Sequence, residues 1–180
     1  MSTRLPRRLD YEDSCKRLQS LGYLDKGAIP PIPDQPPRYD DEEPLGVHFF
    51  RTFVGDGDLG NLTLPRTFFG RSEVGPISFK NTDLSESTLC WNNFNQVDFT
   101  DSDLSKCDLR GSIFNRVVFV RADLRATDLR QSSFKGCDFT DANMRYAKLT
   151  SRQGKTIPLS DTQRNEIDWQ KSDGDPPPGG

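Results

Sequence analysis

The sequence has very few of the side chains from which metal sites and catalytic sites are most often built. Its 180 residues include a single histidine, His48, and four cysteines without any C-x-x-C spacing. A histidine-based metal site or catalytic triad therefore has almost nothing to build on, and no nucleophile stands with a base beside it. We expect no enzyme, no cofactor and no metal, and we expect the four cysteines to be free thiols.

Long apolar runs and a surplus of one charge are also missing. No run approaches the roughly 20 apolar residues that a membrane span requires, and the basic opening lacks the apolar segment of a secretory signal. The formal net charge is −3, which is typical neither of a basic nucleic-acid-binding protein nor of a strongly acidic one. We expect a cytoplasmic protein that contacts neither a membrane nor nucleic acid directly.

What the sequence does contain is a repeat of five residues. From Phe49 to Leu149 every fifth residue is apolar, within a stretch that runs from Val47 to Thr150. An amphipathic helix has a period of about 3.6 residues and a strand a period of about 2, so neither fits a step of five. From residue 82 onward, the residue two places before each of these apolar residues is nearly always small. Residues two apart on an extended chain point the same way, so the small and the large residue share one side. The pattern predicts a repeat architecture with both residues facing inward.

A longer period, made of four of these steps, lies over the first. From Leu84 the large residues run Leu, Leu, Phe, Phe, and this order repeats through Phe139. Four short faces therefore make one turn, and residues 47–150 supply about five coils. Stacked coils should place Phe94, Phe114 and Phe134 in one column, each residue on its equivalent.

The residue between the small and the large position is mostly Asp or Asn, as in TDLSE, SDLSK, CDLRG, ADLRA, TDLRQ, CDFTD and ANMRY. This motif resembles that of the pentapeptide-repeat family, whose consensus is a small residue, Asp or Asn, Leu or Phe, and two variable polar residues. The resemblance covers residues 47–150 and implies an all-β fold, a right-handed quadrilateral β-helix. It is specific for the fold and says little about function.

The residues before the repeat are expected to form a helix and a strap that close the first coil. Asp10 can cap a helix over residues 11–21, in which Cys15 and Leu18 form an apolar stripe. The Pro-rich stretch IPPIPDQPPRYDDEEPLG that follows is expected to run extended along the surface. It is either a strap or linker or, in a sharper interpretation, a ligand for an SH3-like partner. Because an uncovered solenoid end exposes unpaired backbone groups, the helix is the natural cap.

A second capping helix is expected after the repeat. Ser160 and Gln163 have the spacing of a capping box, which predicts a helix over residues 161–171. Residues 173–180 have no means of burying apolar surface and are expected to be disordered. The predicted divisions of the chain are 1–46, 47–150, 151–172 and 173–180.

Aspartate recurs in columns along the predicted coils, and Asp83, Asp103 and Asp123 form one of them. Interpreted as catalysis, such a column would be a set of paired carboxylates that share a proton or hold a metal. Interpreted as structure, each Asp bonds the backbone of its turn. The structural interpretation is favoured because catalytic groups are few and uniquely placed. Acidic and basic residues between Phe79 and Leu149 are equal in number, so the rod is expected to be neutral.

Several outward positions of the repeat carry apolar residues where polar ones are expected. They lie in one coil on adjoining faces, with an aromatic residue at the corner one coil below and two arginines beside them. Such a patch is typical of the centre of a protein interface. The predicted partner-binding residues are Trp91, Ile113, Arg116, Val118, Val120 and Arg121. In the alternative, the Pro-rich segment or the N-terminal helix covers this patch within the same chain.

These features predict a non-enzymatic protein that uses a rigid rod surface to hold or block another protein, with a homodimer possible. By analogy with the family, we expect a bacterial protective role such as immunity or antitoxin. The alternative is the DNA mimicry by which some pentapeptide-repeat proteins protect type II topoisomerases such as DNA gyrase and give quinolone resistance. That role requires a surplus of negative surface, which the neutral rod lacks, and is often accompanied by projecting loops, which the unbroken register does not show.

Overall fold

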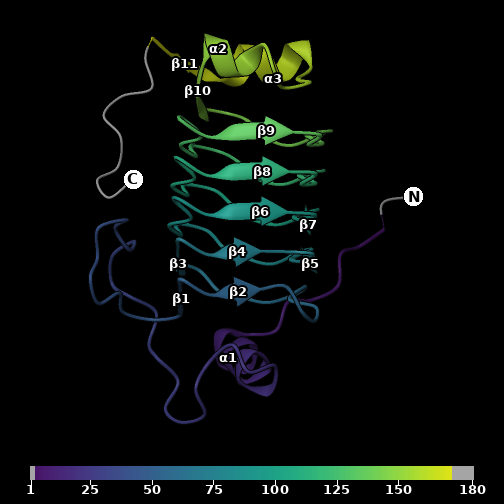
Figure 1. Ribbon diagram of the computed structural model, residues 1–180. Helices are drawn as coiled ribbons and strands as arrows, with labels where there is room; N and C mark the ends of the chain where they lie inside the picture. Colours follow the sequence, from purple (N-terminus) through teal and green to yellow (C-terminus); the bar gives the residue numbers. More distant parts are fainter. Residues whose placement is uncertain (1–2, 172–180) are drawn as a thin grey trace.

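The computed structural model describes residues 3–171 and shows a column of stacked coils with helices at both ends (Figure 1). The strands are β1 (His48–Phe50), β2 (Phe53–Val54), β3 (Phe68–Gly70), β4 (Glu73–Val74), β5 (Ile77–Ser78), β6 (Asn93–Asn95), β7 (Val97–Asp98), β8 (Ile113–Asn115), β9 (Ser133–Lys135), β10 (Lys148–Thr150) and β11 (Asp168–Gln170). All strand pairs within residues 3–171 are parallel, and partners stand four pentapeptide steps apart, as with Phe94 and Phe114. The predicted quadrilateral solenoid with capping helices is confirmed.

The strands stack into separate faces around the column. Strands β2, β4, β6, β8 and β9 form one sheet, which we call the five-stranded face. The strands β5 and β7 lie on the next face, and isolated bridges at Val118 and Asp138 extend it. The strands β1 and β3 begin a third face, which continues through bridges at Thr88, Asp108 and Asp128 to β10. Each outward residue therefore belongs to an identifiable face.

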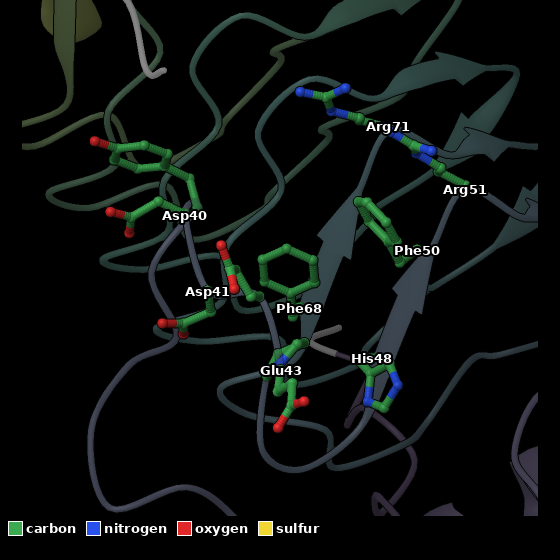
Figure 2. Close-up of a pocket in the computed structure, with 11 residues that line it drawn as sticks. Asp40, Asp41, Glu43, His48, Phe50, Arg51, Phe68 and Arg71 are labelled. Carbon is green, nitrogen blue, oxygen red and sulfur yellow. The ribbon is translucent and has the colours of Figure 1, made fainter. Parts of the chain in front are cut away.

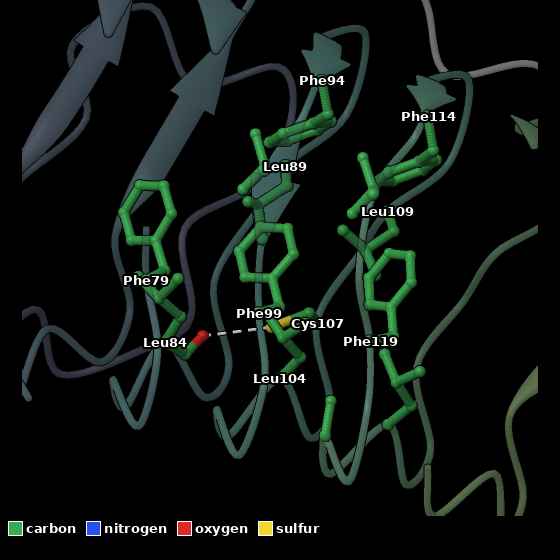
Figure 3. Close-up of a cluster of buried hydrophobic side chains, with 14 of the residues drawn as sticks. Phe79, Leu84, Leu89, Phe94, Phe99, Leu104, Cys107, Leu109, Phe114 and Phe119 are labelled. Carbon is green, nitrogen blue, oxygen red and sulfur yellow. Dashed lines mark hydrogen bonds between the residues drawn. The ribbon is translucent and has the colours of Figure 1, made fainter. Parts of the chain in front are cut away.

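The core is a set of stacked side chains, as the longer period predicts. Phe94 and Phe114 have ring centroids 4.9 Å apart and planes 2° apart, and Phe114 and Phe134 are 5.1 Å and 7° apart. Figure 3 shows this column beside a second one that contains Phe99 and Phe119, whose ring centroids are 5.6 Å apart. Phe114 is fully buried, whereas Phe134 is half-buried because its strand, β9, is the last of its sheet.

The small inward residues form a buried hydrogen-bond ladder beside the aromatic columns. The Ser112 hydroxyl donates to the Leu89 carbonyl at 2.7 Å and accepts from the Asn92 amide at 3.0 Å. The Cys107 thiol donates to the Leu84 carbonyl at 3.0 Å. These positions therefore favour Ser, Thr and Cys, because a buried carbonyl without a partner is costly. All four cysteines are buried and free, as expected.

The aspartates stabilise the corners of the coil. The Asp103 carboxylate accepts from the Ser105 amide at 2.9 Å, just before the corner residue Lys106, whose φ is 57°. A left-handed conformation is unfavourable for a residue with a side chain, so the corner needs such local support. The same bond recurs at Asp83, Asp98, Asp108, Asp123, Asp128 and Asp138. This confirms the structural interpretation of the aspartate columns.

The N-terminal cap is helix α1 (Tyr11–Ser20), close to the predicted bounds. The Asp10 carboxylate caps it by accepting from the Asp13 amide at 2.8 Å. The Ser14 hydroxyl in turn accepts from the Thr63 amide in the first coil at 2.8 Å. Since Cys15 and Leu18 join the solenoid core, the helix closes one side of the first coil with both polar and apolar contacts.

The C-terminal end differs from the prediction. Helix α3 spans Asp161–Glu166, and a short helix, α2 (Ser151–Gly154), precedes it, so the helix predicted over residues 161–171 is wrong beyond Glu166. The chain becomes extended at Ile167, and β11 pairs with β10 so that Trp169 lies beside Leu149. Trp169 stands 20 residues, or one coil, after Leu149, so the longer period is restored after the helices although the five-residue apolar step is interrupted at Arg164.

With the returning strand the solenoid has about six coils, which roughly matches the predicted number of about five. Parallel pairing along one face makes six steps, each one coil long, through His48, Phe68, Thr88, Asp108, Asp128, Lys148 and Asp168. The predicted disordered stretch 173–180 lies outside the described residues. The divisions at residues 46, 150 and 172 stay predictions.

Two glutamine side chains close the last coil. The Gln163 amide group donates to the carbonyls of Phe139 and Ala142 at 2.7 and 3.0 Å. Gln153 repeats this arrangement earlier in the chain, with bonds of 2.7 and 2.9 Å to Leu129 and Ser132. Each glutamine also completes the capping box of its own helix. Each side chain thus satisfies carbonyls that a further coil would otherwise have bonded.

We predict that Gln163→Ala lowers the free energy of unfolding by about 1–3 kcal/mol, because two carbonyls lose their shared donor in a buried place. Urea denaturation followed by circular dichroism measures the change. Thr162→Ala, at the exposed neighbouring position, is the matched control and should be close to neutral. Equal stabilities of the two variants would contradict the capping role of Gln163.

Candidate functional site

The predicted apolar residues lie around one corner of the solenoid. Ile113 is on β8 in the five-stranded face, and 52% of its side chain is exposed. Val118 and Val120 are half-buried and flank the inward Phe119 on the β5–β7 face. Arg116, with a φ of 54°, forms the corner between the two faces. We call Ile113, Arg116, Val118 and Val120 the apolar corner.

Trp91 does not belong to this corner. It precedes β6, whereas Arg116 follows β8, so the two residues lie at opposite edges of the five-stranded face. The indole ring lies against Gly111, where an added Cβ would be only 3.0 Å from the ring. Its Nε1 is buried and has no hydrogen-bond partner among the described residues. Trp91 therefore packs on the backbone of the next coil, and the absent side chain of Gly111 makes room for it.

The two predicted arginines differ in whether their side chains are already held by an ion pair. Arg121 makes a bidentate ion pair with Asp101, with distances of 2.8 Å from Nε to Oδ1 and 3.0 Å from Nη2 to Oδ2. Its exposed side chain is thereby held along the next corner. The Arg116 side chain is exposed and makes no ion pair or hydrogen bond within residues 3–171. Arg116 is therefore the cation that the apolar corner offers to a partner.

The Pro-rich strap contacts a different side of the solenoid. The Arg66 side chain donates to the Pro33 carbonyl at 2.8 Å, the Thr88 hydroxyl donates to the Pro37 carbonyl, and Arg110 lies over the Tyr39 ring at 5.3 Å. These contacts follow the face that β1 and β3 begin. The polar contacts of helix α1 reach the first coil at Asp58 and Thr63. The apolar corner is therefore outside the contacts made by both segments.

The outward aspartates are paired locally with arginines. Arg110 donates to both carboxylate oxygens of Asp108 at 2.8 and 2.6 Å, and Arg125 does the same for Asp123. Burial acts to raise the pKa of Asp108, but the hydrogen bonds from Arg110 outweigh it and hold the pKa below its ordinary value. The pKa of Asp123 is lowered in the same way by Arg125. Within residues 3–171 no group of three or more His, Cys, Asp or Glu residues could hold a metal ion.

A groove that the sequence analysis missed lies between the strap and the first two coils. Figure 2 shows Phe68 between the acidic turn of the strap, with Asp40, Asp41 and Glu43, and Phe50 on β1. The cavity measures about 850 Å³. The signal in the sequence was two Phe-Phe pairs. When Phe49 and Phe69 face inward, their neighbours Phe50 and Phe68 must face outward.

Comparison with known proteins assigns the family. Residues 77–116 and 118–151 match the family described as pentapeptide repeats, in eight copies. The chain is a pentapeptide-repeat protein. The matched pentapeptide repeats begin at residue 77, and this agrees with the sparse aspartates before it, since between Phe49 and Phe79 only Asp58 stands directly before an inward large residue.

Solved structures of other pentapeptide-repeat proteins are similar in fold. HetL from the cyanobacterium Nostoc sp. strain PCC 7120 is 18% identical with a TM-score of 0.53, and the match covers 56% of this chain and 48% of HetL. The chain thus spans about half the length of HetL. A pentapeptide-repeat protein of the Arabidopsis thaliana thylakoid lumen is 28% identical, with 63% and 72% of the two chains covered and a TM-score of 0.33.

QnrB1, a plasmid-mediated fluoroquinolone resistance protein, is 16% identical, with 74% and 70% of the two chains covered and a TM-score of 0.30. A comparison with curated proteins found no match. The likeness to HetL shows the fold alone, and the two lower scores add nothing to it. None of the helices in residues 3–171 has the length and apolar character needed to span a bilayer.

We predict that the stability of this pentapeptide-repeat protein decreases in acid. The carboxyl groups of Asp108 and Asp123 have lower pKa values folded than unfolded, so their stabilisation is present above the ordinary value of 3.8 and is lost as the pH falls below it. The melting temperature should be nearly constant from about pH 7 to 5 and should fall below about pH 4. Asp108→Asn should lower the melting temperature at pH 7 and weaken its acid dependence.

The matched control is Asp25→Asn, which removes an exposed carboxylate outside the solenoid. Differential scanning calorimetry across this pH range measures both effects. An acid dependence that is the same in Asp108→Asn as in the unmodified protein would contradict the role of the Asp108–Arg110 pair.

Proposed function

We propose that this pentapeptide-repeat protein is a non-enzymatic binding protein that holds or blocks another protein against the outside of its solenoid. The observation that carries the proposal is the uncovered apolar corner. Ile113 and the two valines stand on a surface otherwise made mainly of Asp, Asn, Ser and Arg. Since burial of apolar area contributes about 25 cal/mol per Å², covering this corner with a partner would be favourable.

The rigidity of the coil supports this role. The corner lies between β8 and the Val118 bridge, and each of these is hydrogen-bonded to the coil below and the coil above. A surface that is already ordered loses little conformational entropy on binding. Arg116 adds an uncommitted cation beside the apolar side chains, and arginine is one of the residues favoured at interface centres.

The finer role that we propose is a protective one in the bacterial cytoplasm, of the immunity or antitoxin type. In this role the protein would block or shield its partner by occupying a surface, and no reaction would be needed. The proposal of this role rests on analogy with the family, whereas the proposal of protein binding rests on the apolar corner.

Gyrase protection by DNA mimicry is the competing function. A DNA mimic needs uncompensated negative charge along its length. Here Asp101, Asp108 and Asp123 are each paired with an arginine at hydrogen-bond distance. The electrostatics of the rod therefore favour docking through the apolar corner over imitation of DNA.

We predict that the double variant Ile113→Asp with Val118→Asp loses partner capture because it places two charges at the centre of the apolar corner. The tagged protein is used to capture partners from a lysate of the organism that encodes it, and bound proteins are identified by mass spectrometry. The control, Asn143→Asp with Thr162→Asp, adds the same charge at exposed positions away from the corner. A partner captured equally by both variants, with melting temperatures unchanged, would exclude the corner as the binding surface.

The competing function has its own test. We predict that the protein, in molar excess, leaves quinolone inhibition of gyrase unchanged in a DNA supercoiling assay, because the rod lacks the net negative surface of a mimic. QnrB1 serves as the positive control. Protection that increases with protein concentration would overturn the neutral-rod argument and establish the competing function.

A further inference from the structure

The groove beside the strap, which we call the strap groove, has an aromatic floor, in contrast to the aliphatic apolar corner. Its floor is Phe50 on β1 together with Phe68 on β3, which is only 3% exposed, and the two ring centroids are 6.5 Å apart. Phe50 is 51% exposed although it is a large aromatic side chain. A second hollow of about 380 Å³ shares His48 and Phe50 and continues toward Phe53, which is 56% exposed. The two hollows therefore adjoin at His48 and Phe50.

The two walls of the strap groove carry opposite charges in unequal number. The acidic wall is the turn 40–43 with its four carboxylates, and the basic wall has two guanidinium groups, those of Arg51 and Arg71. Four carboxylates outnumber two guanidinium groups, so the acidic wall has the excess of charge. Figure 2 shows the acidic side chains on one side of Phe68 and the arginines on the other. An occupant therefore needs an apolar body and an excess of positive charge.

Two of the four carboxylates of the acidic wall have no partner within residues 3–171. Asp40 and Asp41 are engaged with Arg38, at 3.1 Å from the Arg38 Nε and 2.8 Å from its backbone amide. Glu42 and Glu43 are exposed and make no hydrogen bond or ion pair within residues 3–171. On the opposite wall, Arg51 lies over the Phe50 ring at 5.2 Å. The carboxylates of Glu42 and Glu43 are thus available to a ligand, and they lie beside the aromatic floor.

A protein segment fits this site better than a nucleic acid or a compact small molecule. Four carboxylates repel phosphates. The two hollows that adjoin at Phe50 favour an extended chain. Within residues 3–171 strand β1 pairs only with β3, so its other edge has no strand partner there and can form backbone hydrogen bonds with such a chain. We propose that the strap groove binds an extended peptide segment of a partner protein, in which a Lys or Arg stands next to a large apolar side chain. This inference rests on the proposed protein-binding function and adds a second surface to it.

The test is a selection from a random peptide display library on the full chain, followed by calorimetric titration of the selected peptides as synthetic probes. We expect the selected peptides to share a basic residue beside an aromatic or large aliphatic one. The isosteric double variant Glu42→Gln with Glu43→Gln should weaken their binding roughly three- to tenfold and reduce its salt dependence. Phe50→Ser should weaken binding further. Both changes are at exposed positions, and melting curves confirm folding.

The control is Ile113→Asp, which should leave peptide binding unchanged because the apolar corner is on another face. Selected peptides without a basic residue, no enrichment, or binding that tolerates all three substitutions in the groove would overturn the proposal. Sedimentation that reveals a dimer dissociated by the Glu42/Glu43 variant would also overturn it, because the occupant would then be a second copy of this chain. The two proposals can fail separately. If peptides do not bind the strap groove but the Ile113/Val118 variant still loses partner capture, only the groove proposal is overturned and the proposed function stands.

Discussion

The structure depends on one geometric constraint, which is that each coil closes in four pentapeptide steps and places every inward side chain on its own equivalent. Phe114 stacks nearly parallel on both Phe94 and Phe134, with interplanar angles of 2° and 7°. In the middle coils a column of this kind repeats one residue size, because the interior is close-packed and a mismatch in one coil is felt by both neighbours. The size changes only toward the ends, where Val74 pairs with Phe94 and Trp169 with Leu149. The inward positions are thus constrained by the fold. Function can be encoded only in the outward residues and at the ends.

The same constraint makes the ends of the column its weak points, and the two ends are closed by different chemistry. At the N-terminal end, helix α1 brings Cys15 and Leu18 into the core and bonds the first coil through Ser14. At the C-terminal end, Gln153 and Gln163 donate side-chain amides to the Ser132 and Ala142 carbonyls, whose equivalents one coil below accept backbone amides. Within residues 3–171, β1 and β2 each have a strand partner on one side only, and the exposed Phe50 and Phe53 lie on them.

The repeat could be predicted from sequence because its signal is local, whereas the errors arose where distant contacts decide the conformation. The apolar step from Phe49 to Leu149 determines the coil, and the aspartates determine the corners. Ser160 correctly predicts where helix α3 begins. Where it ends is determined by Leu149, which offers a partner for Trp169 once the chain has turned back. The strap groove could not be predicted, since it depends on the path of the strap across the first two coils.

The apolar corner and the strap groove differ in chemistry, and the fold keeps them independent. One presents aliphatic side chains around Arg116, and the other presents aromatic rings beside Glu42 and Glu43, which make no ion pair within residues 3–171. In a solenoid each coil contacts only its neighbours, and a stacked core has no second packing into which it could switch. Occupation of one surface therefore has no conformational route to the other. A partner that contacted both surfaces would bind with higher affinity, because the second contact would be intramolecular and would benefit from a high effective concentration. The rigid column would fix the distance between the two surfaces.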